Sequence, residues 1–107
     1  MVNGEGNDYP QEGQEVLVNY EGKLENGKIF DSSYDKEALK VPIGVGNVIK
    51  GWDIGIMSMR LGEKAELTIS PDYAYGVAGT PPDIPGMATL IFTVELLMFN
   101  DRRPTRW

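Results

Sequence analysis

The feature that most constrains this chain is the alternation of apolar with other residues in four separate stretches. A period of two is the pattern of a β-strand that buries one face and exposes the other. We therefore expect a protein built mainly on a β-sheet. The alternating residues are Val16, Val18 and Tyr20 in residues 14–21; Leu39, Val41, Ile43 and Val45 in residues 39–45; Ala65, Leu67 and Ile69 in residues 64–70; and Leu90, Phe92, Val94 and Leu96 in residues 88–99.

Turn-forming residues indicate how these stretches connect. Asn26-Gly27 is a strong signal for a tight hairpin, so the first strand is expected to return through Ile29 and Phe30. Pro42 limits its stretch to an edge strand or to irregular pairing, because proline has no N–H to donate to a neighbouring strand. Residues 71–87 form a long loop rich in proline and glycine, and such loops in compact domains are usually functional.

One short stretch, residues 48–57, has helical periodicity instead. Its apolar residues recur at spacings of three and four and so share one face; they are Val48, Ile49, Trp52 and Ile56. Gly51 and Gly55 each weaken a helix by up to ~1 kcal/mol relative to alanine, so packing must hold it, with Trp52 as the main anchor. Antiparallel strands with a single short helix predict an α+β fold, in which a twisted antiparallel sheet wraps around that helix.

Length and charge limit the class of protein. The 107 residues suit one domain spanning residues 1–107, with an irregular lead-in (1–13) and a basic tail (100–107). A net charge of −6 argues against nucleic acid as a partner, because phosphate binding requires clustered lysine and arginine. The first eight residues have no apolar core and no basic flank, so we do not expect them to act as a signal peptide, and no apolar run in the sequence is long enough to span a bilayer. The lack of cysteine fits a reducing compartment, so we expect a cytoplasmic protein. We also expect a monomer that does not bind membranes.

The absence of histidine and cysteine limits the chemistry. Catalysis by Ser-His-Asp or Cys-His groups is excluded. Residues 44–51 superficially suggest a dinucleotide-binding loop, but Ile49 stands where the third glycine is needed. A metal site made only of carboxylates, or a carboxylate pair for glycoside hydrolysis, stays open, although no acidic run has EF-hand spacing. We predict no metal and no cofactor.

Aromatic residues beside a carboxylate indicate a binding pocket. Phe30, Trp52 and Tyr75 come from three separate segments, and Asp31 directly follows Phe30. An apolar cavity with a few polar groups at its wall is the usual form of a small-ligand site. Each residue also has a simpler explanation, because a tryptophan on a short helix is usually core and Asp31 before Ser32 can form a turn.

Several motifs in the same order give the chain a family resemblance. It resembles the FKBP family, the tacrolimus- and rapamycin-binding peptidyl-prolyl isomerases, from about Gly13 to Phe99. The resemblance implies the fold described above, with the pocket between the concave sheet face and the helix. It also implies catalysis of rotation about the peptide bond that precedes proline. This rotation has a barrier of ~18–20 kcal/mol and requires neither proton transfer nor a covalent intermediate. The motifs are residues 18–22 (VNYEG), 30–33 (FDSS), 48–52 (VIKGW), 67–76 (LTISPDYAYG), 88–92 (ATLIF) and 94–97 (VELL).

The resemblance also implies a role for each candidate site residue. Trp52 would form the floor under a proline ring, and the walls would be Tyr20, Phe30 and Phe92. The hydroxyl of Tyr75 and the backbone N–H of Ile49 would bond ligand carbonyls, while Asp31 would accept a hydrogen bond or bias the charge around the twisting carbonyl. Val48 and Ile49 would close one side, and Ile84 would form an apolar rim on the long loop.

The chain departs from the family pattern at several places. Leu39 replaces a common aromatic and softens one wall, and Asp83 puts a charge where an apolar rim residue is usual. The chain is also expected to begin after the family's first strand, which would leave one sheet edge open. The basic tail has no counterpart in the family pattern. Its role could be that of a linker to another module, a contact with a partner, or a cover for the open sheet edge.

Three hypotheses for the function follow. The leading one is a peptidyl-prolyl cis-trans isomerase that acts on X-Pro bonds of peptides and unfolded proteins, assists folding and binds tacrolimus- or rapamycin-type macrolides. The alternative is a module that binds a proline-containing peptide or partner with little or no turnover. The third is a structural scaffold whose pocket is filled.

Overall fold

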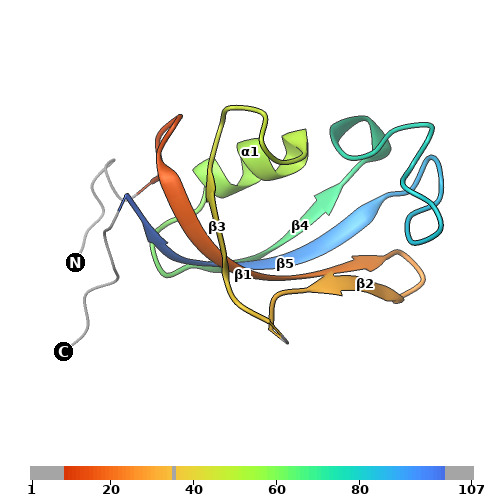
Figure 1. The fold of residues 1–107 in the computed structure, drawn as a ribbon, viewed down its shortest axis with the longest axis horizontal. Coiled ribbons are helices and arrows are strands. Elements are labelled where there is room, and N and C mark those ends of the chain that lie inside the picture. The colour runs from red at the N-terminus through yellow and green to blue at the C-terminus, as the bar shows by residue number, and fades with distance from the viewer. Residues whose placement is uncertain (1–8, 35, 101–107) are drawn as a thin grey trace.

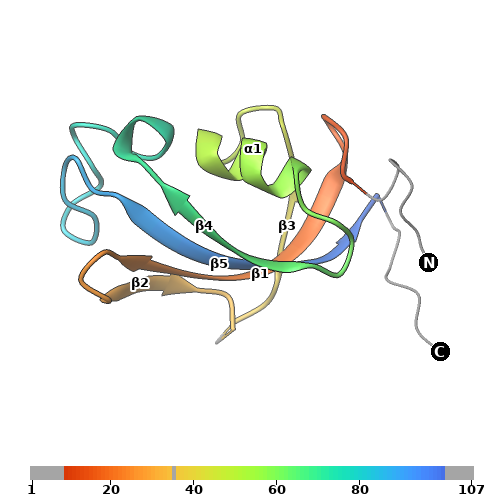
Figure 2. The same cartoon turned by 180° about the vertical axis from the view of Figure 1, so that it is seen from behind.

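The computed structural model describes residues 9–34 and 36–100 of the chain. They form a five-stranded antiparallel sheet of β1 (Glu15–Leu24), β2 (Ile29–Ser32), β3 (Leu39–Pro42), β4 (Lys64–Ile69) and β5 (Leu90–Phe99). One helix, α1 (Lys50–Met57), lies over its concave face, and a 3₁₀ turn, η2 (Pro71–Tyr73), follows β4 (Figures 1 and 2). The predicted α+β fold is confirmed. Most of the expected lead-in (1–13) and tail (100–107) lies outside the described residues.

The long antiparallel pair of β1 and β5 is the centre of the sheet. The strands run in the order β2-β1-β5-β4, and β3 pairs with the first half of β1, from Glu15 to Val18. The predicted alternation along β5 is confirmed, because its inward residues are all buried: Leu90, Phe92, Val94 and Leu96. The pairing continues to the strand ends, where the N–H of Asn100 donates to the carbonyl of Glu15 at 2.7 Å.

The helix is shorter than predicted at its N-terminal end. Ile49 has an extended backbone (ψ 152°) and caps the helix, so Val48 and Ile49 belong to the preceding loop. Trp52 and Ile56 point into the core, as predicted. An added Cβ at Gly55 would lie 2.8 Å from the Cδ1 of Leu67. The glycines of the helix therefore let its backbone rest directly on β4.

The two edges of the sheet differ. On one side β2 and β3 both pair with β1, so Pro42 does lie in an edge strand, as its lack of an N–H requires. On the other side β4 ends the sheet of the described residues. The long loop of residues 71–87 is held together by a bridge between Thr80 and Ile84 and by the N–H of Met87, which donates to the carbonyl of Gly76 at 2.9 Å.

Candidate functional site

Four aromatic side chains from four elements meet between the sheet and the helix. Tyr20 of β1 lies edge-on to Trp52 of α1, with ring centroids 5.1 Å apart. Phe92 of β5 contacts Trp52 at 5.2 Å and Phe30 of β2 at 5.6 Å, again edge-on. Edge-to-face contacts of this kind each contribute about 0.5–1.5 kcal/mol beyond the burial of the rings. The aromatic cluster therefore fixes strands and helix in one mutual arrangement.

A cavity of about 200 Å³ opens beside this cluster. It brings together all of the site residues expected from the sequence except Ile84. This residue belongs to the long loop of residues 71–87, but its side chain is buried in the core. Asn47 is the one lining residue that sequence reasoning missed, because nothing but its position before Val48 marked it. The lining residues are Tyr20, Phe30, Asp31, Leu39, Asn47, Val48, Ile49, Trp52, Tyr75 and Phe92.

A glycine on β1 makes the aromatic contacts possible. Gly22 pairs with Asp31 across the β1–β2 ladder. A Cβ added at Gly22 would lie 2.6 Å from the Cε1 of Phe92 and 2.7 Å from the Cζ of Phe30. The two rings therefore occupy the space that any side chain at this position would need. The sequence contained Gly22 within a shared motif, but only the structure shows what it does.

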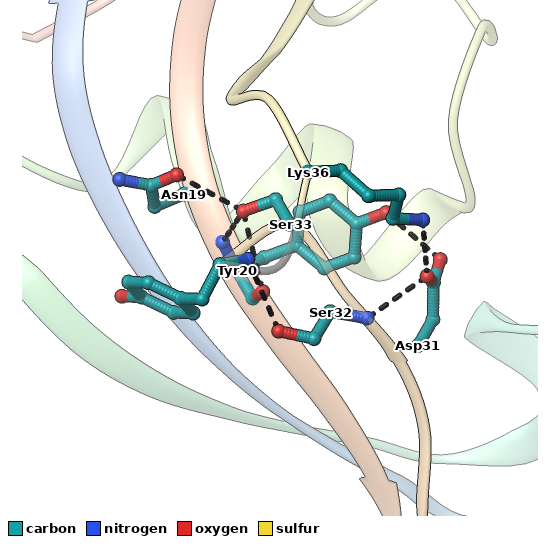
Figure 3. Close-up of polar contacts among 7 residues, drawn as sticks. Asn19, Tyr20, Asp31, Ser32, Ser33 and Lys36 are labelled. Carbon is teal, nitrogen blue, oxygen red and sulfur yellow. Dashed lines mark hydrogen bonds and ion pairs between the residues drawn. The ribbon is translucent and has the colours of Figure 1, made fainter.

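The wall of the cavity carries a polar network centred on the carboxylate of Asp31 (Figure 3). The hydroxyl of Tyr20 donates to Oδ2 of Asp31 at 2.8 Å. The Nζ of Lys36 forms an ion pair with Oδ1 at 3.0 Å, and the N–H of Ser32 donates to the same oxygen at 2.9 Å. Both carboxylate oxygens are thus held in place at the wall of a cavity that is lined mainly by aromatic and aliphatic side chains.

This network shifts two pKa values in opposite directions. Burial, and then the hydrogen bond to Asp31 and its charge, raises the pKa of Tyr20 to about 12. Burial alone would raise the pKa of Asp31, but the hydrogen bonds from Tyr20, Lys36 and Ser32 together with the charge of Lys36 lower it. At neutral pH the site therefore contains a carboxylate and a protonated phenol.

Ser33 fixes the strand segment that carries Tyr20. Its side chain is buried (2% exposed), and its hydroxyl accepts the N–H of Tyr20 at 2.8 Å and donates to Oδ1 of Asn19 at 3.0 Å (Figure 3). Its own N–H donates to the carbonyl of Tyr20 at 2.8 Å. Buried polar groups are stable only when they are hydrogen-bonded in this way. Ser33 therefore supports the site from behind without lining the cavity.

Among the hydrogen-bond donors at the cavity, two that can face a ligand have no acceptor within residues 9–34 and 36–100. They are the backbone N–H of Ile49 and the hydroxyl of Tyr75, a residue that is 42% exposed. Burial raises the pKa of Tyr75, and the charge of Asp31 adds to that effect, so the hydroxyl keeps its proton and can donate it. The indole N–H of Trp52 is buried and likewise has no partner in the described part of the chain.

A second, larger hollow of about 480 Å³ lies between α1 and the outer side of β4. It is lined by Gly51, Ile54 and Gly55 of the helix, by residues 66–69 of β4, and by Ser70 and Tyr73. It contains none of the residues expected at the site. Its greater volume therefore does not make it the better candidate.

The described residues show no cluster of three or more side chains that could hold a metal ion. Within residues 9–34 and 36–100 there is also no helix with the length and apolarity that crossing a membrane requires. The aromatic cavity, with its carboxylate and with the open donors of Ile49 and Tyr75, defines a class of protein that acts on a ligand through shape and hydrogen bonding.

Comparison with known proteins names that class. Residues 6–97 match the sequence model of the FKBP-type peptidyl-prolyl cis-trans isomerases. The chain is 55% identical to FK506-binding protein 1A of Aspergillus fumigatus over 101 residues, which are 94% of this chain and 90% of the relative. It is 52% identical to the peptidyl-prolyl cis-trans isomerase of Schizosaccharomyces pombe over 104 residues, 96% of this chain and 93% of the relative. The chain therefore belongs to the FKBP family of peptidyl-prolyl cis-trans isomerases.

Proposed function

We propose that this isomerase acts on X-Pro bonds of peptides and unfolded proteins and so assists protein folding. The observation that carries the proposal is the aromatic cavity, whose floor is Trp52 and whose free donors are the N–H of Ile49 and the hydroxyl of Tyr75. A pyrrolidine ring requires an apolar slot of this kind. The carbonyls on either side of the proline require donors, and these two donors have no acceptor within the described chain.

The proposed mechanism is selective binding of the twisted amide. Twisting the bond ends the amide resonance, so electron density returns from the carbonyl oxygen to the nitrogen. A carboxylate at the cavity wall, Asp31, disfavours the planar amide with its negative oxygen more than the twisted amide. An enzyme that binds the twisted form more tightly than the planar form lowers the rotation barrier directly. Ile49 and Tyr75 hold the flanking backbone while Tyr20, Phe30 and Phe92 exclude water from the ring.

The same cavity is proposed to bind tacrolimus- and rapamycin-type macrolides. Three of the relatives support this, since the proteins of Aspergillus fumigatus, Rhizopus delemar and Yarrowia lipolytica are named FK506-binding proteins. Leu39 gives an aliphatic wall at the cavity, and Ile84 supports the rim loop from within the core.

We further propose that residues 1–107 act as one domain, as a monomer in the cytoplasm.

The test is the rate of cis-to-trans conversion of a short X-Pro peptide, with and without rapamycin. The uncatalysed process takes tens to hundreds of seconds, so catalysis is easily seen. Rapamycin-sensitive acceleration is the expected result. Trp52→Leu and Asp31→Val should lower the rate while leaving the fold intact, and unchanged turnover in both variants would contradict the site assignment.

A second candidate function is a module that binds a proline-containing partner with little turnover. The exposed apolar residues Val77 (80% exposed) and Met87 (64% exposed) on the long loop favour it, because they offer a partner additional surface. Binding of rapamycin or of a proline peptide without acceleration would support this candidate over the enzyme.

A further inference from the structure

The loop of residues 43–49 connects β3 to α1 and supplies one wall of the cavity. Asn47, Val48 and Ile49 line the cavity, and Ile49 carries the N–H that is free for a ligand. This wall has no strand or helix of its own to hold it. Two of its residues, Gly44 (φ +83°) and Gly46 (φ +82°), adopt the left-handed conformation that favours glycine. A loop with this much glycine must be held from outside.

The side chain that holds the loop comes from the helix. Asp53, in the first turn of α1, accepts the N–H of Gly44 through Oδ1 at 2.7 Å and the N–H of Gly46 through Oδ2 at 3.1 Å. Hydrogen bonds from backbone N–H groups to a carboxylate are stronger than those between neutral groups. Gly46 directly precedes Asn47, so the second bond fixes the loop one residue before the cavity wall begins.

We infer that Asp53 is a positioning residue of the isomerase: its carboxylate holds the wall of residues 47–49 at a fixed distance from the floor of the cavity. Trp52, the proposed floor, is the neighbour of Asp53 on the same helix. The helix thus carries both the floor and the anchor of the wall. Asp53 does not line the cavity itself, and the inference rests on the proposed function of that cavity.

The consequence concerns substrate binding. A wall that is already ordered loses little freedom when a proline peptide binds, and a loosened wall must be ordered at that moment. Misplacing a positioning group by about 1 Å can cost about a hundredfold in rate. We therefore expect Asp53→Ala to lower kcat/KM between about tenfold and a hundredfold, mainly through a higher KM. Asp53→Asn, which keeps one acceptor oxygen, should lose less, and Asp53→Glu should recover most of the activity.

The experiment combines turnover with amide hydrogen exchange. Wild type, Asp53→Ala, Asp53→Asn and Asp53→Glu are compared for isomerisation of an X-Pro peptide and for rapamycin affinity. Exchange at the amides of Gly44 and Gly46 should become at least about tenfold faster in Asp53→Ala, because both amides lose their acceptor. Glu25→Ala, at the exposed tip of the β1–β2 hairpin, removes one carboxylate far from the loop and should change neither readout.

The outcomes separate this inference from the proposed function. Unchanged exchange at Gly44 and Gly46 would overturn the anchor, and faster exchange with unchanged KM and rapamycin affinity would overturn the positioning role. If the wild type binds rapamycin without turnover, the proposed catalytic function is refuted. The ratio of the rapamycin dissociation constants of Asp53→Ala and wild type then still tests the role of Asp53. If the wild type neither turns over a peptide nor binds rapamycin, both the proposed function and the positioning role of Asp53 are refuted. Amide exchange at Gly44 and Gly46 then still shows whether Asp53 holds the loop. The far-ultraviolet circular dichroism of every variant shows whether the fold survives. If Asp53→Ala does not fold, the conservative variant Asp53→Asn takes its place in the comparison.

Discussion

At the scale of single residues, Gly22 contributes to the cavity by having no side chain. Phe30 and Phe92 fill the space that a Cβ there would occupy. We predict that Gly22→Ala destabilises the protein by about 1–3 kcal/mol, the usual cost of overpacking a core, and reduces turnover because the two rings must separate. Urea unfolding and the peptide assay measure both effects. Glu21→Ala on the same strand is the control, and equal stability of the two variants would contradict the prediction.

The pKa of Tyr20 provides a second test at this scale. Burial is the largest cause of its rise to about 12, and the hydrogen bond to Asp31 and the charge of Asp31 add to it. We predict that Asp31→Asn lowers the pKa of Tyr20, which nevertheless stays above the ordinary tyrosine value of 10.0 because the burial is unchanged. Tyrosine ultraviolet absorbance as a function of pH measures the shift, and subtraction of the Tyr20→Phe titration assigns it. A pKa that does not move would refute the coupling of the two groups.

At the scale of elements, the contact of α1 with β4 explains why the helix contains glycine. Alanine at an exposed helical position is favoured over glycine by about 1 kcal/mol. We predict the opposite sign for Gly55→Ala, because the new Cβ would lie 2.8 Å from the Cδ1 of Leu67 and push the helix away from the strand.

A double-mutant cycle isolates this contact. Leu67→Ala removes the crowding atoms, so Gly55→Ala should become neutral or stabilising in that background. The free energies of unfolding of the two single variants and the double variant give the coupling energy. Simple additivity would mean that the helix does not rest on β4 as described.

The sequence predicted elements better than their boundaries. Alternation identified β1, β4 and β5, and apolar residues at spacings of three and four identified α1, because burial of one face imposes those periods. Helical spacing continued through Val48 and Ile49, but their backbone is not helical, since the loop that carries them is anchored by Asp53. Periodicity cannot detect such an anchor, because the bonds join a side chain to amides nine and seven residues away.

The candidate site was predictable for a different reason. Its aromatic residues and Asp31 come from short motifs that resemble a known family, and the structure brings them together around one cavity. Ile84, which pairs with Thr80 in an isolated bridge, is buried in the core and does not line that cavity. Asn47 and Gly22 were missed as site residues because their roles depend on which chain segments become neighbours in space.

At the scale of the whole molecule, the raised pKa of Tyr20 predicts how stability depends on pH. In the unfolded chain this phenol titrates near 10.0, and in the folded protein near 12. The folded state therefore binds more protons between these values, so the contribution of Tyr20 is complete below the lower value and is lost as the pH rises toward the higher one. Tyr20→Phe should lose less stability across this window than the wild type.

Urea midpoints measured at several pH values between about 9 and 12 would check this prediction. Tyr73→Phe, which removes an exposed tyrosine, is the control and should follow the wild type. If Tyr20→Phe and the wild type lose stability in parallel, the buried phenol is not the group responsible.

The pairing of Asn100 with Glu15 brings the start of β1 and the end of β5 to the same place. Within residues 9–34 and 36–100, the first and last strands are therefore neighbours, and a domain with this arrangement can be inserted into a surface loop of another protein. It can equally be given new ends at the exposed hairpin of Asn26 and Gly27, since the two central strands would still pair. The strand arrangement that encloses the cavity thus also makes this domain suitable for insertion into other proteins and for circular permutation.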